Sequence, residues 1–355
     1  MQKLIALAVF CGLLAGCQED EGDTTVRDDY TNHFSALPQQ AIFPQDNQYT
    51  EAKAKLGEFL FWDPILSGDE NVACASCHHP DFGWADGRKF SIGVDGVGLG
   101  PDRIGFAETP IHAPTVANTA FTGFQLNTDP DNFIAGPYFW DLRADSLETQ
   151  SLGPIANAIE MRGEAISEAD IFPTIEARLA NIQEYQALFS EAFPNEEQIT
   201  MSLVAKALAT YQRTLFAGNS RFDQFIAGDT SVFNAEEVAG LNKFIDAGCA
   251  RCHSGPMLSD NLIHETQPVL EHSPAVRTPS LRNISATAPY MHTGERETLG
   301  SAISLYEGRD DLDVSLGDDD FGKLEAFLRT LNTPSLSRQI PERVPSGLPI
   351  GGDIN

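Results

Sequence analysis

Apolar residues recur at intervals of three and four along several stretches of this chain, which is the spacing of one face of an α-helix. The clearest stretch runs from Glu196 to Phe216. Its apolar positions are Ile199, Leu203, Val204, Ala207, Leu208, Tyr211 and Leu215. A second stretch runs from Glu51 to Trp62, where Thr50 can cap the first turn and Pro64 ends the helix. No stretch alternates between apolar and polar residues as a strand would, so the pattern predicts an all-α protein.

Two further long stretches also have helical periodicity. Ser167–Phe193 is expected to be helical with a break near Pro173, because proline removes a backbone donor. Asn234 is expected to open another helix, with Glu237 three residues later in the arrangement of a capping box, and Gly248 to close it.

The remaining stretches are shorter or irregular. Short helices are expected at Thr298–Glu307, which Gly308 closes, and at Asp319–Leu331. Ser91–Arg103 is rich in glycine, but no strand precedes it, so a loop is expected rather than a phosphate-binding turn. The tail at 333–355 is rich in proline and glycine and is expected on the surface.

The charge of the chain excludes one class of partner. Its 355 residues include 51 Asp and Glu against 23 Lys and Arg, a formal net charge of −28. Binding to phosphate backbones requires basic patches, so nucleic acid is not expected as a partner. Solubility alone accounts for the acidic excess, although a basic partner protein would also fit it.

The N-terminal stretch has the features of a secretory signal. Residues 1–16 combine a basic Lys3 with an apolar core and small residues, and this core is too short to span a membrane. Residues 14–17 (Leu-Ala-Gly-Cys) resemble a lipobox, in which Cys17 becomes the lipidated first residue. An ordinary signal peptide cut nearby is the alternative. Residues 17–43 are acidic and polar and are expected to form a tether. We therefore expect a periplasmic protein, anchored by lipid to the outer membrane.

Two copies of one short motif carry the chemistry. Residues 74–78 (C-A-S-C-H) and 249–253 (C-A-R-C-H) both read C-x-x-C-H, the attachment signature of c-type haem. The two thiols can add to the vinyl groups of one haem, and the histidine becomes the proximal ligand of its iron. A zinc site would need both pairs to converge on one metal, and a thioredoxin-like pair expects a βαβ context that is not seen. The predicted attachment and ligand residues are Cys74, Cys77 and His78 for one haem and Cys249, Cys252 and His253 for the other.

Together with the residues around them, these motifs resemble the bacterial dihaem cytochrome c peroxidases and their relatives of the MauG type. The stretches that carry the resemblance are Leu56–Phe61, Phe139–Ala144, Leu147–Gln150, Gly153–Ile155, Glu160–Met161, Thr278–Asn283 and Pro289–Gly294. The resemblance covers nearly the whole chain after the signal peptide. It implies two cytochrome c-like domains, a peroxidatic haem domain at 44–180 and an electron-transfer haem domain at 181–332.

The resemblance also implies roles for single residues. Glu160, twenty residues after Trp140, is expected to carry a proton between the two oxygens of hydrogen peroxide, and Gln150 to orient the peroxide or its water. Trp140 is expected to lie between the haems and relay electrons. Arg143 and Arg282 are expected to pair with haem propionates. Each role has an alternative. Glu160 could be a solvated acid, Gln150 a surface amide and Trp140 a core aromatic residue, and the two arginines could form surface ion pairs.

The axial positions differ from those of many family members. No histidine lies between His79 and His112, where those members have a distal ligand, so the first haem is expected to be open at rest. Tyr306 stands 14 residues after His292, where many members have a methionine ligand to the second haem and the MauG branch has tyrosine. A tyrosinate ligand favours oxidised iron. The alternative for Tyr306 is a buried tyrosine of the core.

The resemblance further implies one calcium ion between the domains. Backbone oxygens near Thr287 and Pro289 would contribute to its coordination, but His112 stands where the family has an asparagine ligand.

Three functions are consistent with these residues. The first is an exported peroxidase that reduces hydrogen peroxide with electrons from a small redox protein, a cytochrome c or a cupredoxin. The second is a MauG-like enzyme that oxidises side chains of a partner protein through a bis-high-valent haem state, which Tyr306 and the missing distal histidine favour. The third is a dihaem electron carrier without catalysis, which would need neither Glu160 nor Gln150. The shared motifs favour the peroxidase as the broad activity.

Overall fold

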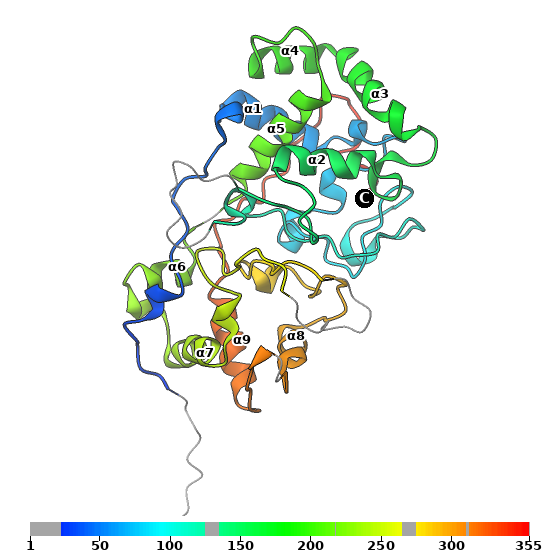
Figure 1. The fold of residues 1–355 in the computed structure, drawn as a ribbon. Helices are drawn as coiled ribbons and strands as arrows, with labels where there is room; N and C mark the ends of the chain where they lie inside the picture. The colour runs from blue at the N-terminus through cyan, green and yellow to red at the C-terminus, as the bar shows by residue number, and fades with distance from the viewer. Residues whose placement is uncertain (1–22, 125–134, 217, 265–274, 310–311, 355) are drawn as a thin grey trace, which may run out of the picture.

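The computed structural model describes residues 23–124, 135–216, 218–264, 275–309 and 312–354, which form two helical lobes stacked end to end (Figure 1). Over these ranges the regular structure is helical, with isolated β-bridges and no β-strand. The all-α prediction is therefore confirmed for the described residues. The predicted signal peptide and Cys17 lie outside these ranges. None of the helices within them is long and apolar enough to cross a membrane.

The α-helices are divided between the lobes. The upper lobe of Figure 1 contains α1 (Glu51–Trp62), α2 (Leu147–Ala156), α3 (Glu168–Ala180), α4 (Gln183–Ala192) and α5 (Met201–Thr214). The lower lobe contains α6 (Arg221–Ile226), α7 (Ala235–Asp246), α8 (Leu299–Ile303) and α9 (Asp320–Arg329). A π-helical turn at Ala158–Arg162 lies between α2 and α3. Short 3-10 helices and irregular segments make up much of the rest.

Each lobe is built on a pair of crossing helices with a glycine at the contact. In the upper lobe α1 packs on α5, and a Cβ added to Gly57 would lie 2.0 Å from the Ala207 carbonyl oxygen. In the lower lobe α7 packs on α9, and a Cβ added to Gly240 would lie 1.9 Å from the Lys323 carbonyl oxygen. Because no side chain fits at either position, the two backbones approach closely and the crossing is fixed.

Several helix boundaries follow from local capping chemistry, as predicted. The hydroxyl of Thr50 accepts a hydrogen bond from the Lys53 amide at 3.2 Å, and α1 ends at Trp62 before Pro64. Asn234 and Glu237 form the reciprocal capping box, with two bonds of 2.9 Å. These interactions satisfy amide groups that have no partner within the helix.

The predicted break at Pro173 is wrong. Helix α3 continues through Pro173, and the chain leaves the helix only after Ala180. Ile171, Ile175 and Leu179 are fully buried on one face of α3. The burial of these three side chains outweighs the one hydrogen bond that proline removes.

The division of the cores does not coincide with the predicted boundary at residue 180. The first core includes Tyr185 of α4 and Leu208 of α5, and it extends to Leu215. The reason is that α5 is the helix on which α1 packs, so it completes the first lobe although it is distant in sequence from α1. Most residues of the second core lie between Phe222 and Leu331.

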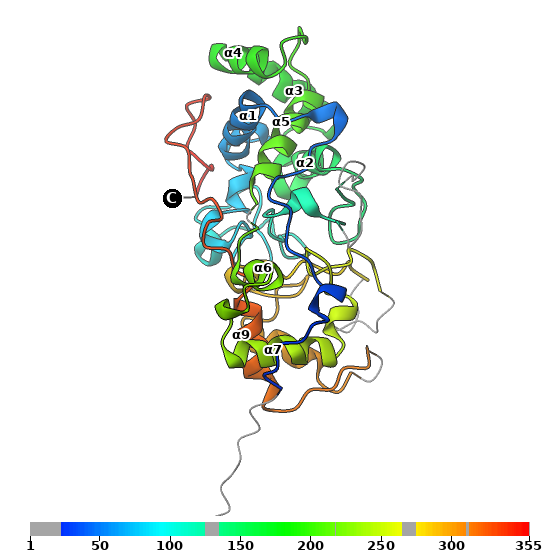
Figure 2. The same cartoon turned by 90° about the vertical axis from the view of Figure 1, so that its left-hand side faces the viewer.

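Both ends of the described chain are built into these cores. Tyr30 and Phe34, from the predicted tether, are buried in the second core, and the Tyr30 hydroxyl donates to the Asn242 side-chain oxygen at 2.7 Å. Much of the tail is exposed, as predicted, but Val344 is only 2% exposed and packs in the first core, so the tail is anchored to the upper lobe. Figure 2 shows this C-terminal segment in red, running from the lower lobe along the upper one.

Candidate functional site: two C-x-x-C-H turns and the space between the lobes

The two C-x-x-C-H motifs fold in the same way in different lobes. In each, a 3-10 turn begins at the first cysteine, and the amide of the following histidine donates to the carbonyl of that cysteine, at 3.0 Å for His78 and 2.9 Å for His253. Cys74 packs against the first core and Cys249 against the second. Since the two pairs belong to separate cores, a four-cysteine zinc site is not supported.

Both histidines are held by one ring nitrogen. Nδ1 of His78 lies 3.3 Å from the Trp84 carbonyl oxygen, and Nδ1 of His253 lies 3.1 Å from the Leu258 carbonyl oxygen. A carbonyl can only accept, so Nδ1 carries the proton and donates in both cases. Nε2 therefore keeps its lone pair, which is the arrangement of a histidine prepared to bind metal.

Burial keeps these groups in their neutral forms. It lowers the pKa of His78 to about 4 and also lowers the pKa of His253, so both rings are neutral at physiological pH. Burial also raises the pKa of Cys74 to about 12 and that of Cys249 to about 11. A neutral imidazole is the form that binds iron. The protonation state of both histidines is therefore compatible with haem.

A second repeated unit follows each motif. Pro114 and Pro279 are each followed four residues later by an asparagine, Asn118 or Asn283, with left-handed backbone angles (φ of 61° and 56°). The amide of Asn118 donates to the Leu215 carbonyl at 2.8 Å, just beyond α5. The amide of Asn283 makes the equivalent bond, donating to the Leu331 carbonyl at 3.1 Å, just beyond α9. The spacing Pro-x-x-x-Asn was the sequence signal for this duplication, and it was not used in the prediction.

A cavity of about 640 Å³ adjoins the second motif. Cys249, Cys252 and His253 line it, and so does Tyr306, which ends a 3-10 helix after α8. Apolar side chains from α8, α9 and the segment between them complete the wall: Leu299, Ile303, Leu312, Leu316, Leu324 and Leu328. A volume and lining of this kind suit a large, mostly apolar cofactor, so the residues present fit a haem.

Tyr306 is therefore placed in the same cavity as His253. Burial raises the pKa of Tyr306 to about 12, so the phenol is protonated unless a cation such as iron displaces the proton. This placement is what a sixth ligand requires, while ligation itself stays a prediction.

Trp140 lies where the two lobes meet. Its indole nitrogen donates to the His112 carbonyl at 2.9 Å, and its ring lies 6.1 Å from the His292 ring. The His112 amide in turn donates to the His292 carbonyl at 2.8 Å. Trp140 also lines the cavity of the second motif. The position agrees with the predicted relay between haems, although no contact tests that role.

Glu160 lies on the π-helical turn beside the first motif. The Asn157 side chain fixes this turn, accepting from the amides of Ile159 and Glu160 at 2.8 and 3.3 Å and donating to the Glu160 carboxylate at 3.0 Å. Burial raises the pKa of Glu160, while nearby Arg143 acts in the opposite direction. The charge of Glu160 also helps to raise the pKa of the Cys77 thiol, which places the carboxylate near the first haem motif.

The glycine-rich loop packs against the same turn. The Val94 amide donates to the Ile159 carbonyl at 3.1 Å, and a Cβ added to Gly93 would lie 1.9 Å from that oxygen. Arg103 is buried and donates to the carbonyls of Ile92, at 2.8 Å, and Gly93, at 3.1 Å. The glycines of this loop thus allow a close approach to the turn that carries Glu160.

The other predicted residues have partners of their own. Arg282 and Asp223 form a buried bidentate ion pair at 2.8 and 2.9 Å, which gives no support to the predicted propionate role of Arg282. Arg143 pairs with Asp141 at 2.7 Å. Gln150 is half-buried on α2, the helix that precedes the π-helical turn.

Sequence reasoning missed a buried acid near the first motif. Asp86 is 1% exposed, and burial raises its pKa to about 7. Its negative charge also helps to raise the pKa of the Cys77 thiol. Nothing in the local sequence marks Asp86, because its surroundings come from segments that meet only in the fold.

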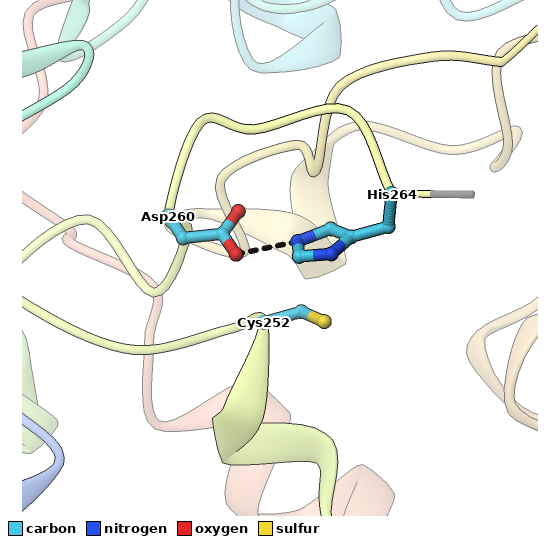
Figure 3. A group of neighbouring side chains, drawn as sticks. All are labelled: Cys252, Asp260 and His264. Atoms are coloured by element: carbon cyan, nitrogen blue, oxygen red, sulfur yellow. Dashed lines mark hydrogen bonds and ion pairs between the residues drawn. The ribbon is translucent and has the colours of Figure 1, made fainter. Parts of the chain in front are cut away.

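Cys252 lies close to two polar residues, Asp260 and His264 (Figure 3). Asp260 and His264 are joined by a contact of 2.6 Å, and the ligand atoms of all three residues lie within 4.8 Å of one another. Such a group could hold a metal only while Cys252 is a free thiol. If Cys252 forms a haem thioether, as predicted, the Asp260–His264 pair would lie beside that haem.

The calcium prediction receives little support from the donors. Thr287, Pro289 and His112 all line the cavity, but Nδ1 of His112 already donates to the Arg88 carbonyl at 2.8 Å. Calcium prefers six to eight oxygen ligands, and an imidazole is a poor substitute for the expected amide oxygen.

Comparison with known proteins agrees with this geometry. The family model described as "Di-haem cytochrome c peroxidase" matches residues 51–231. The chain is 33% identical over 331 residues to the methylamine utilization protein MauG of Methylorubrum extorquens, covering 86% of this chain and 85% of that protein. It is 31% identical over 327 residues to the cytochrome c551 peroxidase of Nitrosomonas europaea, covering 87% of each. A solved structure of a MauG-like protein associated with microbial copper homeostasis aligns with a TM-score of 0.69 at 27% identity, over 84% of this chain and 95% of that one.

Proposed function

The chain belongs to the di-haem cytochrome c peroxidase family, and from this premise we propose that it is exported and reduces hydrogen peroxide with electrons from a small redox protein. It is a peroxidase-type oxidoreductase. In the proposal, Cys74 and Cys77 hold one haem covalently, and Cys249 and Cys252 hold the other.

One observation carries this proposal. Both C-x-x-C-H turns hold a neutral histidine through Nδ1, and both leave Nε2 for a metal. Two such turns in separate cores are what a protein with two haems needs. If these histidines were only structural, the same Nδ1–carbonyl contact would not be expected after the motif in both lobes.

The residues around the first motif supply proton transfer. When bound, haem supplies the redox chemistry that cleaves the O–O bond. Glu160 can accept the proton of one peroxide oxygen and return it to the other, because burial brings its pKa closer to neutrality. Two electrons and two protons then convert one hydrogen peroxide into two waters. Trp140 contacts His112 and His292 where the lobes meet, and in the proposal it relays electrons between the two haems.

Tyr306 supports a second candidate function, the MauG-like oxidation of a partner protein. It lines the cavity that contains His253, where a phenolate ligand would stabilise oxidised iron. An enzyme of that kind would hold oxidising equivalents rather than take up a reducing electron first.

Mass spectrometry and steady-state turnover test the proposed function. Protein from a cytochrome-maturation host should gain the mass of two haems, and it should consume peroxide with reduced cytochrome c as donor. A gain of one haem or none would refute the dihaem assignment. Two haems with no donor oxidation, but rapid reaction of the ferric protein with peroxide, would favour the MauG-like function.

Export and lipid anchoring form a separate part of the proposal. They rest on the signal-like residues 1–16 and on the lipobox that ends at Cys17. Cell fractionation should find the wild-type protein with the outer membrane and Cys17→Ser in the soluble periplasm. A soluble wild-type protein would contradict the anchor.

A further inference from the structure

Arg277 is a cation without a matching anion at the cavity of the second motif. It lines this cavity together with His253. Its Nε is buried without a hydrogen-bond partner, and one terminal nitrogen donates to the neutral side-chain oxygen of Asn261 at 2.7 Å. Among the described residues, the one titratable group that acts on Arg277 is Tyr138, whose own pKa is raised by burial, so that it stays neutral.

Other buried arginines of the chain do have matching acceptors. Arg282 pairs with Asp223, and Arg213 makes two bonds of 2.6 and 3.0 Å to Glu148. Arg103 donates to a ring of backbone carbonyls. A buried cation is strongly disfavoured unless an anion compensates it, and burial accordingly lowers the pKa of Arg277 to about 10. The unmatched guanidinium therefore indicates an anionic ligand.

Asn261 fixes the direction of this guanidinium. Its side-chain nitrogen lies 3.3 and 3.2 Å from the carbonyl oxygens of Gly136 and Pro137, and its side-chain oxygen accepts from Arg277. Asn261 is 5% exposed and has left-handed backbone angles (φ of 55°). The Arg277 amide also donates to the Trp140 carbonyl at 2.9 Å. These bonds hold Arg277 to the segment 136–140, which carries Trp140.

We propose that Arg277 binds a propionate carboxylate of the haem that Cys249 and Cys252 hold, with Asn261 as its positioning residue. This inference rests on the proposed function, because it requires the second haem. A haem tethered through its vinyl groups brings two carboxylates into the same cavity, and a planar guanidinium pairs well with a carboxylate. Arg277 thereby takes the role that the sequence had suggested for Arg282.

The midpoint potential of the second haem tests the pairing. Without the cation, a buried propionate binds a proton at low pH and releases it as the pH rises. In Arg277→Gln, the potential should therefore match that of the wild type at low pH and fall below it at high pH. Arg277→Lys should restore most of the wild-type profile, because it keeps the charge. Arg329→Gln, on an exposed arginine of α9 that pairs with Glu325, is the control and should follow the wild type.

The haem count separates two kinds of failure. If the wild type lacks a second haem, the proposed function fails. If the wild type and Arg277→Gln both carry two haems and share one potential–pH profile, the pairing fails and the proposed function stands. Should Arg277→Gln not be recovered, Asn261→Ala should show the same deviation to a smaller extent. A wild-type profile in Asn261→Ala would then overturn the proposal.

Discussion

A histidine binds iron reliably when its other ring nitrogen is fixed, and here backbone carbonyls do this for both His78 and His253. The motif alone predicts these two histidines as the iron ligands. The carbonyls that orient them, from Trp84 and Leu258, lie six and five residues further on, respectively, at positions with left-handed backbone angles. A local motif therefore predicts the ligand, whereas the fold supplies the tautomer.

Glu160 gives the first prediction at this scale. Glu160→Gln should keep both haems but react with peroxide about 10²–10⁴-fold more slowly, because a positioned proton carrier is lost. The ionised carboxylate is the form that accepts a proton, and burial raises its pKa. The wild-type rate should therefore fall as the pH drops through a value above the ordinary range for glutamate, and the variant should lack this limb. Stopped-flow mixing with peroxide measures both. Glu164→Gln, an exposed acid on the same segment, is the control; equal rates in the two variants would remove Glu160 from the mechanism.

Tyr306 gives the second prediction. A phenolate ligand stabilises oxidised iron, whereas methionine raises the potential. Axial ligands and their surroundings move haem potentials over a range of about 0.8 V, so Tyr306→Met should raise the potential of the second haem by roughly 0.1 V or more. Potentiometric titration with electron paramagnetic resonance measures this. Tyr290→Phe, at another tyrosine of the same cavity, should leave the potential near the wild-type value. A wild-type haem with a clearly positive potential and a His/Met spectrum would show that Tyr306 is not the ligand.

How far single residues could be predicted depends on the range of their contacts. The cysteines and histidines of the motifs were accessible because five consecutive residues define them. Asp86 and Arg277 were not, because their importance lies in burial among segments distant in sequence. Arg282 was assigned to a propionate on its motif, and only the fold revealed that Asp223 satisfies it.

At the scale of elements, the helices that begin with a cap and end with glycine or proline were predicted well. Helix α7 opens at the capping box of Asn234 and is followed by Gly248 in left-handed conformation, as expected. Pro173 misled the prediction, since tertiary burial of one face of α3 outweighed the local signal. Helices α2 and α6 were not predicted, because neither has a long apolar stripe.

The crossing of α7 and α9 leads to a prediction about stability. Gly240→Ala should lower the free energy of unfolding by about 1–3 kcal/mol, because the new methyl group would lie 1.9 Å from the Lys323 carbonyl and would force the helices apart. A Cβ added to Gly322, on α9, would lie no closer than 4.0 Å to another atom. Gly322→Ala should therefore raise the free energy of unfolding by up to about 1 kcal/mol through its better helix propensity. Denaturant titration followed by circular dichroism compares them. Equal stability of the two variants would mean that the crossing can relax without cost.

At the scale of the whole molecule, the sequence predicted two haem-bearing units but not how the chain is shared between them. Both lobes repeat a glycine-centred helix crossing, a C-x-x-C-H turn and a left-handed asparagine. The termini then cross between lobes, with Tyr30 and Phe34 in the second core and Val344 in the first. Composition suggested a tether and a surface tail because a few buried side chains hardly change the average polarity of a segment.

The C-terminal segment leads to the last prediction, because it connects the second core to the first haem motif. The Ser76 hydroxyl, inside that motif, donates to the Gly351 carbonyl at 2.7 Å, and the Gly351 amide donates to the Trp62 carbonyl at 2.7 Å. Val344 anchors the segment in the first core, so Val344→Ala should lower the free energy of unfolding of this lobe by about 2 kcal/mol. The loss should appear as faster amide hydrogen exchange in α1 and the first motif turn, while α7 and the second motif keep their protection. Ile340→Ala, at an exposed residue of the same segment, should change neither lobe. If Val344→Ala accelerated exchange equally in both lobes, the segment would be stabilising the molecule as a whole rather than the first haem site.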